Sequence, residues 1–303
     1  MRRHELLISV LRAFLLSLPL SVSAQQDPIY ALYFNNPLTI NPAYAGANSM
    51  LNATVQYRTQ WAGIDSKPST INFNSHMSVL NNKGGVGLMV LQDRIGETKS
   101  TEVSTMYAYK IKLNWATMSF GMQAGFTRYT SDPALLTIRD SGDPSFNPIR
   151  ATNFNVGSGL LFKGEQWVAG ISAPRMLPAS VTQSGTTINL YDQNYYLFGS
   201  YGFFVSEKFR IRPSVLLRAA KGLPLSADIN ASVVIQENYS AGLLTRGFKT
   251  YGFQFVAVIN DLKLGYVLEL PGSSASSLHF TSHEFMLSLS MGVMRYHDRV
   301  NKL

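Results

Sequence analysis

The stretch Glu284-Phe-Met-Leu-Ser-Leu-Ser-Met-Gly-Val293, near the C-terminal end of the chain, alternates between apolar residues and polar or small ones. Side chains of a β-strand point to opposite faces in turn, so a period of two predicts a strand. One face of this strand carries the apolar residues Phe285, Leu287, Leu289, Met291 and Val293, and the other carries Glu284, Ser288, Ser290 and Gly292. We expect the apolar face to contact lipid, as in a membrane-spanning β-barrel.

The same alternation recurs along the chain, for example over residues 101–112 and 208–218. The candidate strands are about 9–13 residues long, which suits a tilted membrane span, whereas strands of soluble proteins average about 5–6 residues. We therefore expect an all-β fold, a transmembrane antiparallel β-barrel of about 14 strands, an even number as in bacterial single-chain barrels. The predicted strands are 50–58, 69–80, 84–92, 101–112, 115–129, 153–163, 166–172, 193–205, 208–218, 227–236, 238–246, 249–258, 261–269 and 282–294.

A soluble β-sandwich also alternates, but two further features favour the membrane. Aromatic residues such as Tyr57, Trp115 and Trp167 stand near the ends of the predicted strands, where barrels carry aromatic girdles. Charged residues make up only 15% of the chain, and there is no cysteine to form disulfides. No mature segment offers the run of about 18 apolar residues that a transmembrane helix needs.

The N-terminus has the pattern of a secretory signal peptide. Arg2, Arg3 and Arg12 lead into an apolar run at 13–22, which is too short to span a bilayer, and Val22-Ser-Ala24 offers small residues for cleavage. The predicted location is the cell outer membrane. We expect a signal peptide at 1–24, an extended periplasmic Asn/Pro-rich segment at 25–49, the outer-membrane barrel at 50–296 and a short C-terminal tail at 297–303.

The titratable residues do not form a recognisable chemical site. The 26 basic and 18 acidic residues are scattered, which argues against nucleic-acid binding. Of the five histidines, His279 and His283 share a strand face but have no third metal ligand near them in sequence. We expect no catalytic residue, metal or cofactor, and hence no enzyme; a barrel hydrolase with a Ser–His site is a weaker alternative.

Short turns and longer connections alternate along the chain, as the two rims of an outer-membrane barrel require. The longer connections are predicted at 59–68, 93–100, 130–152, 173–192, 219–226 and 270–281. Long loops on a rigid scaffold often bind partners, and exposed aromatic, Met and Arg residues anchor interfaces. The candidate partner-binding residues are Phe146, Arg175, Met176 and Tyr191. Alternatively, these loops fold over the barrel and plug it.

The segment Gln26-Asp-Pro-Ile-Tyr-Ala-Leu-Tyr-Phe-Asn-Asn-Pro-Leu-Thr-Ile-Asn-Pro-Ala-Tyr-Ala-Gly46 is too rich in Pro and Asn for a strand. We expect 35–46 to pack on or inside the periplasmic end of the barrel. This segment resembles the opening of the PorP/SprF family of type IX secretion membrane proteins, and the resemblance continues through the mature chain. Its motif residues are Asn35, Pro37, Asn41, Pro42, Ala43, Tyr44, Gly46, Trp61, Asp93, Arg94, Gly96, Pro174, Pro213, Arg218, His283 and Glu284.

The resemblance implies a component of protein secretion in Bacteroidetes that supports export or surface anchoring of secreted proteins, including gliding adhesins. Implied partners are the secretion ring or peptidoglycan-binding lipoprotein components, a secreted client protein, and outer-membrane lipid. A passive channel or porin is the alternative. Charges of both signs at predicted lumen positions tend to pair and fill the barrel, which disfavours an open pore. These positions are Lys110, Lys112, Arg210, Arg212, Arg218, Glu102, Asp228 and Glu284.

Overall fold

The computed structural model describes residues 30–64, 66–132, 148–183, 186–221, 223–272 and 280–297. Two short 3-10 helices, η1 (Pro37–Thr39) and η2 (Pro42–Tyr44), precede the strands. The strands are β1 (Leu51–Ala62), β2 (Ser69–Val79), β3 (Gly84–Ile95), β4 (Thr98–Lys112), β5 (Thr117–Ser131), β6 (Ile149–Lys163), β7 (Trp167–Arg175), β8 (Ala179–Gln183), β9 (Thr186–Tyr191), β10 (Asn194–Tyr201), β11 (Phe203–Phe204), β12 (Phe209–Ala220), β13 (Ser226–Ile235), β14 (Tyr239–Arg246), β15 (Thr250–Ile259), β16 (Leu262–Pro271) and β17 (Thr281–Met291).

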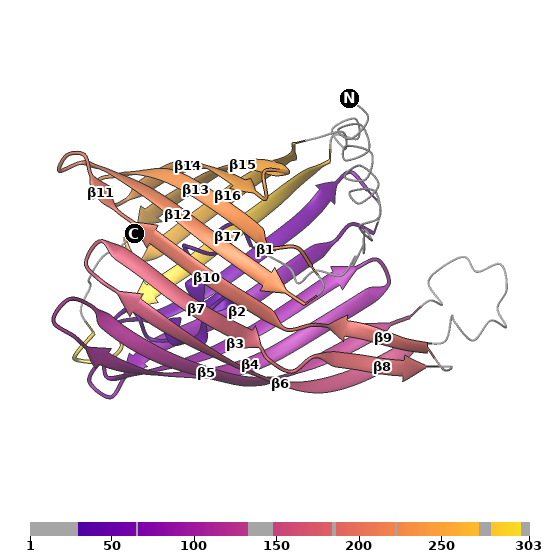
Figure 1. The fold of residues 1–303 in the computed structure, drawn as a ribbon. Coiled ribbons are helices and arrows are strands. Elements are labelled where there is room, and N and C mark those ends of the chain that lie inside the picture. Colours follow the sequence, from indigo (N-terminus) through magenta and orange to yellow (C-terminus); the bar gives the residue numbers. More distant parts are fainter. Residues whose placement is uncertain are drawn as a thin grey trace, which may run out of the picture.

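The strands form a closed antiparallel barrel (Figure 1). Neighbours in sequence pair along the sheet, β1 pairs with β17, and β10 joins β7 to β12, so the ring has no free edge. The ring contains fourteen strands, because β11 is a two-residue continuation of β10 and β8–β9 form a separate hairpin. The expected all-β barrel and its strand number are confirmed.

The barrel has two different rims. At one, which we call the short-turn rim, β2–β3, β4–β5, β6–β7, β10–β12, β13–β14 and β15–β16 are connected. At the other, the long-loop rim, the β8–β9 hairpin extends beyond the barrel wall (Figure 1).

Two of the longer predicted loops are wrong. At 93–100 the paired strands continue to Ile95 and Thr98, so only Gly96-Glu97 make the turn, and Gly96 supplies the positive φ of 57° that such tight turns need. At 173–192 the β8–β9 hairpin replaces an irregular loop. Its two strands, 179–183 and 186–191, contain Val, Thr and Ile, whose branched side chains favour strands. The neighbouring Pro, Gly and Ser residues instead suggest turns.

The two faces of the barrel wall differ as the alternation predicts. On β17, Phe285 and Leu287 are 51% and 47% exposed on the outside, whereas Glu284 and Met286 are 0% and 3% exposed on the inside. Near the short-turn rim, the Trp115 and Trp167 rings stack with centroids 5.9 Å apart, as part of an outward aromatic belt. No helix in the described part of the chain is long and apolar enough to cross a membrane.

Candidate functional site: the filled lumen

Residues Tyr30–Met50, which we call the lumen segment, lie inside the barrel. As expected, they do not form a strand. The segment is compact, however, and not extended as the sequence analysis predicted, because it contains two 3-10 helices. Pro37 and Pro42 begin the two 3-10 helices, where a missing N–H costs nothing. The Asn41 side chain then accepts a hydrogen bond of 2.8 Å from the Ala43 N–H, which caps the second helix.

The lumen segment contacts the wall on several sides. Tyr33, Ile40 and Ala43 pack against β6, β10 and β12 through Leu161, Tyr196, Phe198 and Leu216. On another side, Leu32 packs against β14–β17, and on a third Leu38 packs against Met89 and Met106 of β3 and β4. Leu32 is 0% exposed and Leu38 is 1% exposed. These contacts fill the middle of the barrel with the chain's own residues.

Glycines on the inner wall make room for the segment. A Cβ atom at Gly85 would lie 2.0 Å from the Ala45 carbonyl oxygen, and one at Gly121 would lie 2.2 Å from the Ala43 nitrogen. At Gly159 it would lie 2.1 Å from the Asn41 side-chain oxygen. Because contacts below about 3 Å force atoms to move, the wall is shaped to the segment's backbone.

A buried carboxylate holds the start of the lumen segment. Glu284 of β17 accepts hydrogen bonds from the backbone N–H groups of Ala31 at 2.6 Å and Leu32 at 3.0 Å. Arg58 of β1 donates to the same carboxylate at 3.3 Å. An ionised carboxylate buried among apolar groups requires such donors. The segment's backbone therefore supplies part of the solvation of Glu284.

The charges extend from Glu284 into a network across five strands. Arg58 also pairs with Glu269 of β16. Arg246 of β14 lies 3.2 Å from Glu269 and 3.2 Å from Asp228 of β13. Each carboxylate thus faces at least one guanidinium, which compensates the cost of removing these charges from water.

Asparagine amides fix the middle of the segment. Asn36 donates a hydrogen bond of 2.6 Å to the side chain of Gln56, which points inward from β1. Asn41 donates to the carbonyl oxygens of Leu160 at 3.1 Å and Ile171 at 3.3 Å. Because these residues lie on β1, β6 and β7, the amides connect the segment to opposite parts of the barrel.

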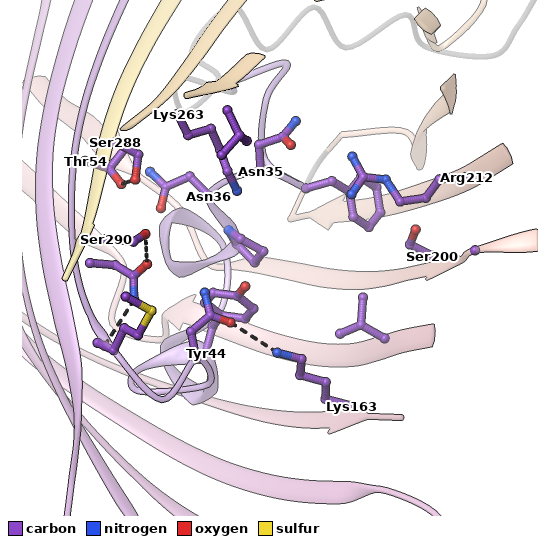
Figure 2. Close-up of a pocket in the computed structure, with 18 of the residues that line it drawn as sticks. Asn35, Asn36, Tyr44, Thr54, Lys163, Ser200, Arg212, Lys263, Ser288 and Ser290 are labelled. Atoms are coloured by element: carbon purple, nitrogen blue, oxygen red, sulfur yellow. Dashed lines mark hydrogen bonds between the residues drawn. The ribbon is translucent and has the colours of Figure 1, made fainter. Parts of the chain in front are cut away.

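Two lysines and a histidine hold the end of the segment. Lys110 donates to the Gly46 carbonyl at 2.5 Å, and the Gly46 N–H donates to Nδ1 of His76 at 3.1 Å. Lys163 donates to the Asn48 side chain at 3.1 Å, beside Tyr44 (Figure 2). Burial raises the pKa of the Tyr44 phenol.

A cavity of about 200 Å³ remains between the lumen segment and the wall towards the short-turn rim (Figure 2). The segment contributes Phe34, Asn35 and Pro37 to its lining. The wall contributes mainly polar and basic side chains, which include Thr54, Lys163, Ser200, Arg210, Arg212, Lys263, Ser288 and Ser290.

The structure divides the predicted motif residues into two groups. Those of the lumen segment and Glu284 meet inside the barrel, as described above. Trp61, at the end of β1, is 51% exposed, Arg94 is exposed beside the Gly96 turn, and Asp93 accepts a hydrogen bond of 2.6 Å from Thr70. These residues belong to the wall or to the long-loop rim and not to the packing of the segment.

The remaining motif residues are structural parts of the wall. The Pro174 carbonyl accepts from Gln123 at 2.8 Å, and Pro213 of β12 is paired with Ala231. Arg218, also on β12, pairs in register with Ser226 of β13. The His283 ring lies within hydrogen-bond distance of the Tyr266 hydroxyl, at 2.9 Å.

Two of the four predicted partner-binding residues point inward. Arg175 forms an ion pair of 2.5 Å with the buried Glu102, and its guanidinium lies 5.3 Å from the centre of the Tyr191 ring. The sequence analysis placed Arg175 in a loop, whereas in the structure it ends β7 and a buried carboxylate draws its side chain into the barrel mouth. Met176 is 41% exposed, and Phe146 lies outside the described residues.

Sequence reasoning did not single out Gln56, Arg58, Arg246 and Glu269, although they hold the segment or its network. The signal was present, because Asn52, Thr54, Gln56 and Arg58 occupy the polar positions of the β1 alternation. Within the described part of the chain, no group of three or more His, Cys, Asp or Glu side chains is placed to hold a metal ion.

Comparisons with known proteins find a matching family and matching solved structures. The family model described as "Type IX secretion system membrane protein PorP/SprF" matches residues 22–289. No curated protein matches the chain. Among solved structures, the CymD monoaromatic hydrocarbon channel is 12% identical over 89% of this chain and 94% of its own, with a TM-score of 0.49. The Acinetobacter baumannii outer membrane protein Omp33 is 7% identical over 80% of this chain and 100% of its own, with a TM-score of 0.46.

Proposed function

Because this chain belongs to the PorP/SprF family of type IX secretion system membrane proteins, we propose that it supports export or surface anchoring of secreted proteins by binding protein partners at its rims. The family and the barrel fold support an outer-membrane location, and they are not those of a known enzyme family. The observation that carries the proposal is the filled lumen, since it leaves the two rims as the surfaces on which the barrel can act.

A passive channel is the competing function. A channel requires a continuous aqueous path, but here the lumen segment packs against β3, β4, β6, β10, β12 and β14–β17. Glycines shaped to its backbone and a charged network hold it there. These contacts support the interpretation that the segment is a permanent plug and not a movable gate.

The β8–β9 hairpin is the proposed contact for a secreted client. It stands beyond the wall at the long-loop rim (Figure 1), and Met176 and Leu177 at its base are each 41% exposed. Exposed apolar side chains beside a strand pair are suitable interface anchors. The ring or peptidoglycan-binding lipoprotein components would then contact the short-turn rim.

The test is the double variant Met176→Ser/Leu177→Ser, compared with Leu225→Ser. Leu225 is 67% exposed on another connection of the same rim and serves as the matched control. We expect the double variant to lower surface display of the client several-fold and the control to leave it unchanged. Insertion of both barrels is checked by heat-modifiable migration in gels. Normal display by the double variant, and by a deletion of 179–190, would exclude the hairpin as a partner site.

A further inference from the structure

The lumen has an uneven distribution of charge. Away from the short-turn rim, Arg58, Arg175 and Arg246 each pair with a buried carboxylate. Four basic residues line the cavity near that rim, Lys163, Arg210, Arg212 and Lys263, against the two acidic residues Glu165 and Asp261. The cavity therefore has an excess of positive charge.

Of these four cations, Arg210 has an ionic partner in the protein, and Lys163 has neutral ones. Arg210 pairs with Glu237 at 2.7 Å, and Lys163 donates to the Asn48 side chain and the Ala47 carbonyl. Among the residues that the structure describes, Arg212 and Lys263 have neither an ion-pair partner nor a hydrogen-bond acceptor. Both are only partly exposed, and like charges in such a space repel each other unless an anion lies between them.

The arrangement of donors fits one class of ligand. Lys163, Arg212 and Lys263 come from β6, β12 and β16 and line the cavity from different sides, with the Asn35 amide nearby (Figure 2). The two oxygens of a carboxylate lie in one plane, whereas the oxygens of a tetrahedral oxyanion accept charge-assisted hydrogen bonds from several directions at once. We propose that this cavity, which we call the basic cavity, binds a phosphate-type oxyanion.

The size and the access route limit the ligand further. At about 200 Å³ the basic cavity is smaller than the pockets of about 300–1,000 Å³ that enclose drug-sized molecules, so it holds the anionic group alone. Turn residues Gly164–Gln166 and Asn260–Asp261 line it at the short-turn rim, and Phe34 and Pro37 line it on the side of the lumen segment. The anion thus enters from the short-turn rim and binds without passing through the barrel.

The test uses inorganic phosphate as the probe. The full-length barrel, purified in detergent without phosphate, is titrated calorimetrically at constant ionic strength. We expect saturable binding that is weakened at least about tenfold in Arg212→Gln/Lys263→Gln, because two charge-assisted contacts are lost. The matched control is Lys112→Gln/Lys208→Gln, which removes two exposed charges outside the cavity lining. Its affinity should equal that of the native protein.

Removing two mutually repelling cations should not prevent folding, but a second measurement is independent of any variant. Phosphate should raise the thermal unfolding temperature of the native barrel more than chloride does at equal ionic strength. Equal effects of the two anions, or unchanged phosphate affinity in the Arg212→Gln/Lys263→Gln variant, would overturn the proposal.

Two sources could supply the phosphate group, a free ion or the headgroup of a lipid. Native mass spectrometry of protein extracted from membranes separates them. A phosphate-bearing lipid that is retained by the native barrel and lost from the double variant identifies the headgroup. Binding of inorganic phosphate without such a lipid identifies the free ion. Binding of neither phosphate nor a lipid shows that water and mobile counter-ions fill the basic cavity, which is the opposite of our inference.

Discussion

At the scale of single residues, the position of Glu284 explains why the lumen segment stays in the barrel. Its two carboxylate oxygens accept from the segment's backbone while Arg58 compensates the negative charge. Withdrawing the segment would break both of these hydrogen bonds together with the packing that surrounds them. The carboxylate therefore couples the stability of the barrel to the presence of the segment.

We predict that Glu284→Gln lowers the free energy of unfolding by about 3 kcal/mol, because it removes a buried charge that Arg58 and two N–H groups need. Glu237→Gln is the matched control. Its carboxylate also pairs with an arginine, Arg210, but is 42% exposed, and its loss should cost at most about 1 kcal/mol. Unfolding in urea of barrels in lipid vesicles measures both. Equal effects of the two changes would show that Glu284 does not hold the segment.

The sequence indicates which charges face inward better than it indicates their partners. Parity along the strands predicts that Glu102, Asp228 and Glu284 face the lumen, and they are 2%, 6% and 0% exposed. Lys112 is predicted to face the lumen too, but it is exposed, since the β4 alternation ends before it. The pairing of Arg58 with Glu269 depends on which strands meet across the closure between β1 and β17, and no local pattern encodes that.

At the scale of elements, the alternation predicts strands well and their connections less well. The period-two patterns at 101–112 and 282–294 predict β4 and β17, because strand alternation is a local property of the sequence. The lumen segment follows no periodicity, because Pro and Asn let it form turns whose shape is set by the glycines of the wall. The sequence thus predicts that 35–46 is not a strand, but its conformation depends on residues such as Gly121 and Gly159, far away in the chain.

We predict that Leu287→Arg destabilises the barrel by about 2–4 kcal/mol, the usual cost of a basic residue facing the centre of a bilayer. Leu287 is 47% exposed on the outer face near the middle of β17. Leu289→Arg is the control for depth. It lies nearer the short-turn rim, where it pairs with Leu262 at the start of β16, and should cost less. Unfolding in lipid vesicles gives both values, and an equal cost at both depths would mean that this face does not cross a membrane.

At the scale of the whole molecule, the number of strands leaves room for the plug. Barrels of about eight strands are filled by their own wall side chains, whereas those of about sixteen to eighteen leave an aqueous channel. With fourteen strands, this barrel is too wide for its wall side chains alone, and the lumen segment supplies Leu32, Tyr33, Leu38 and Ile40 to the core. The segment is thus both the barrel's core and its barrier.

Deleting residues 30–49 should therefore convert a closed barrel into an open one. We predict that the native protein gives no steady conductance in a planar lipid bilayer, and that the deletion gives steady single-channel currents. Deleting 179–190 is the control, since the β8–β9 hairpin lies outside the barrel wall and its loss should leave the membrane closed. Because the deletion of 30–49 also removes packing, its barrel is first checked by heat-modifiable migration. A native protein that conducts as strongly as the 30–49 deletion would show that the lumen segment is no barrier, and would favour the passive channel over the secretion component.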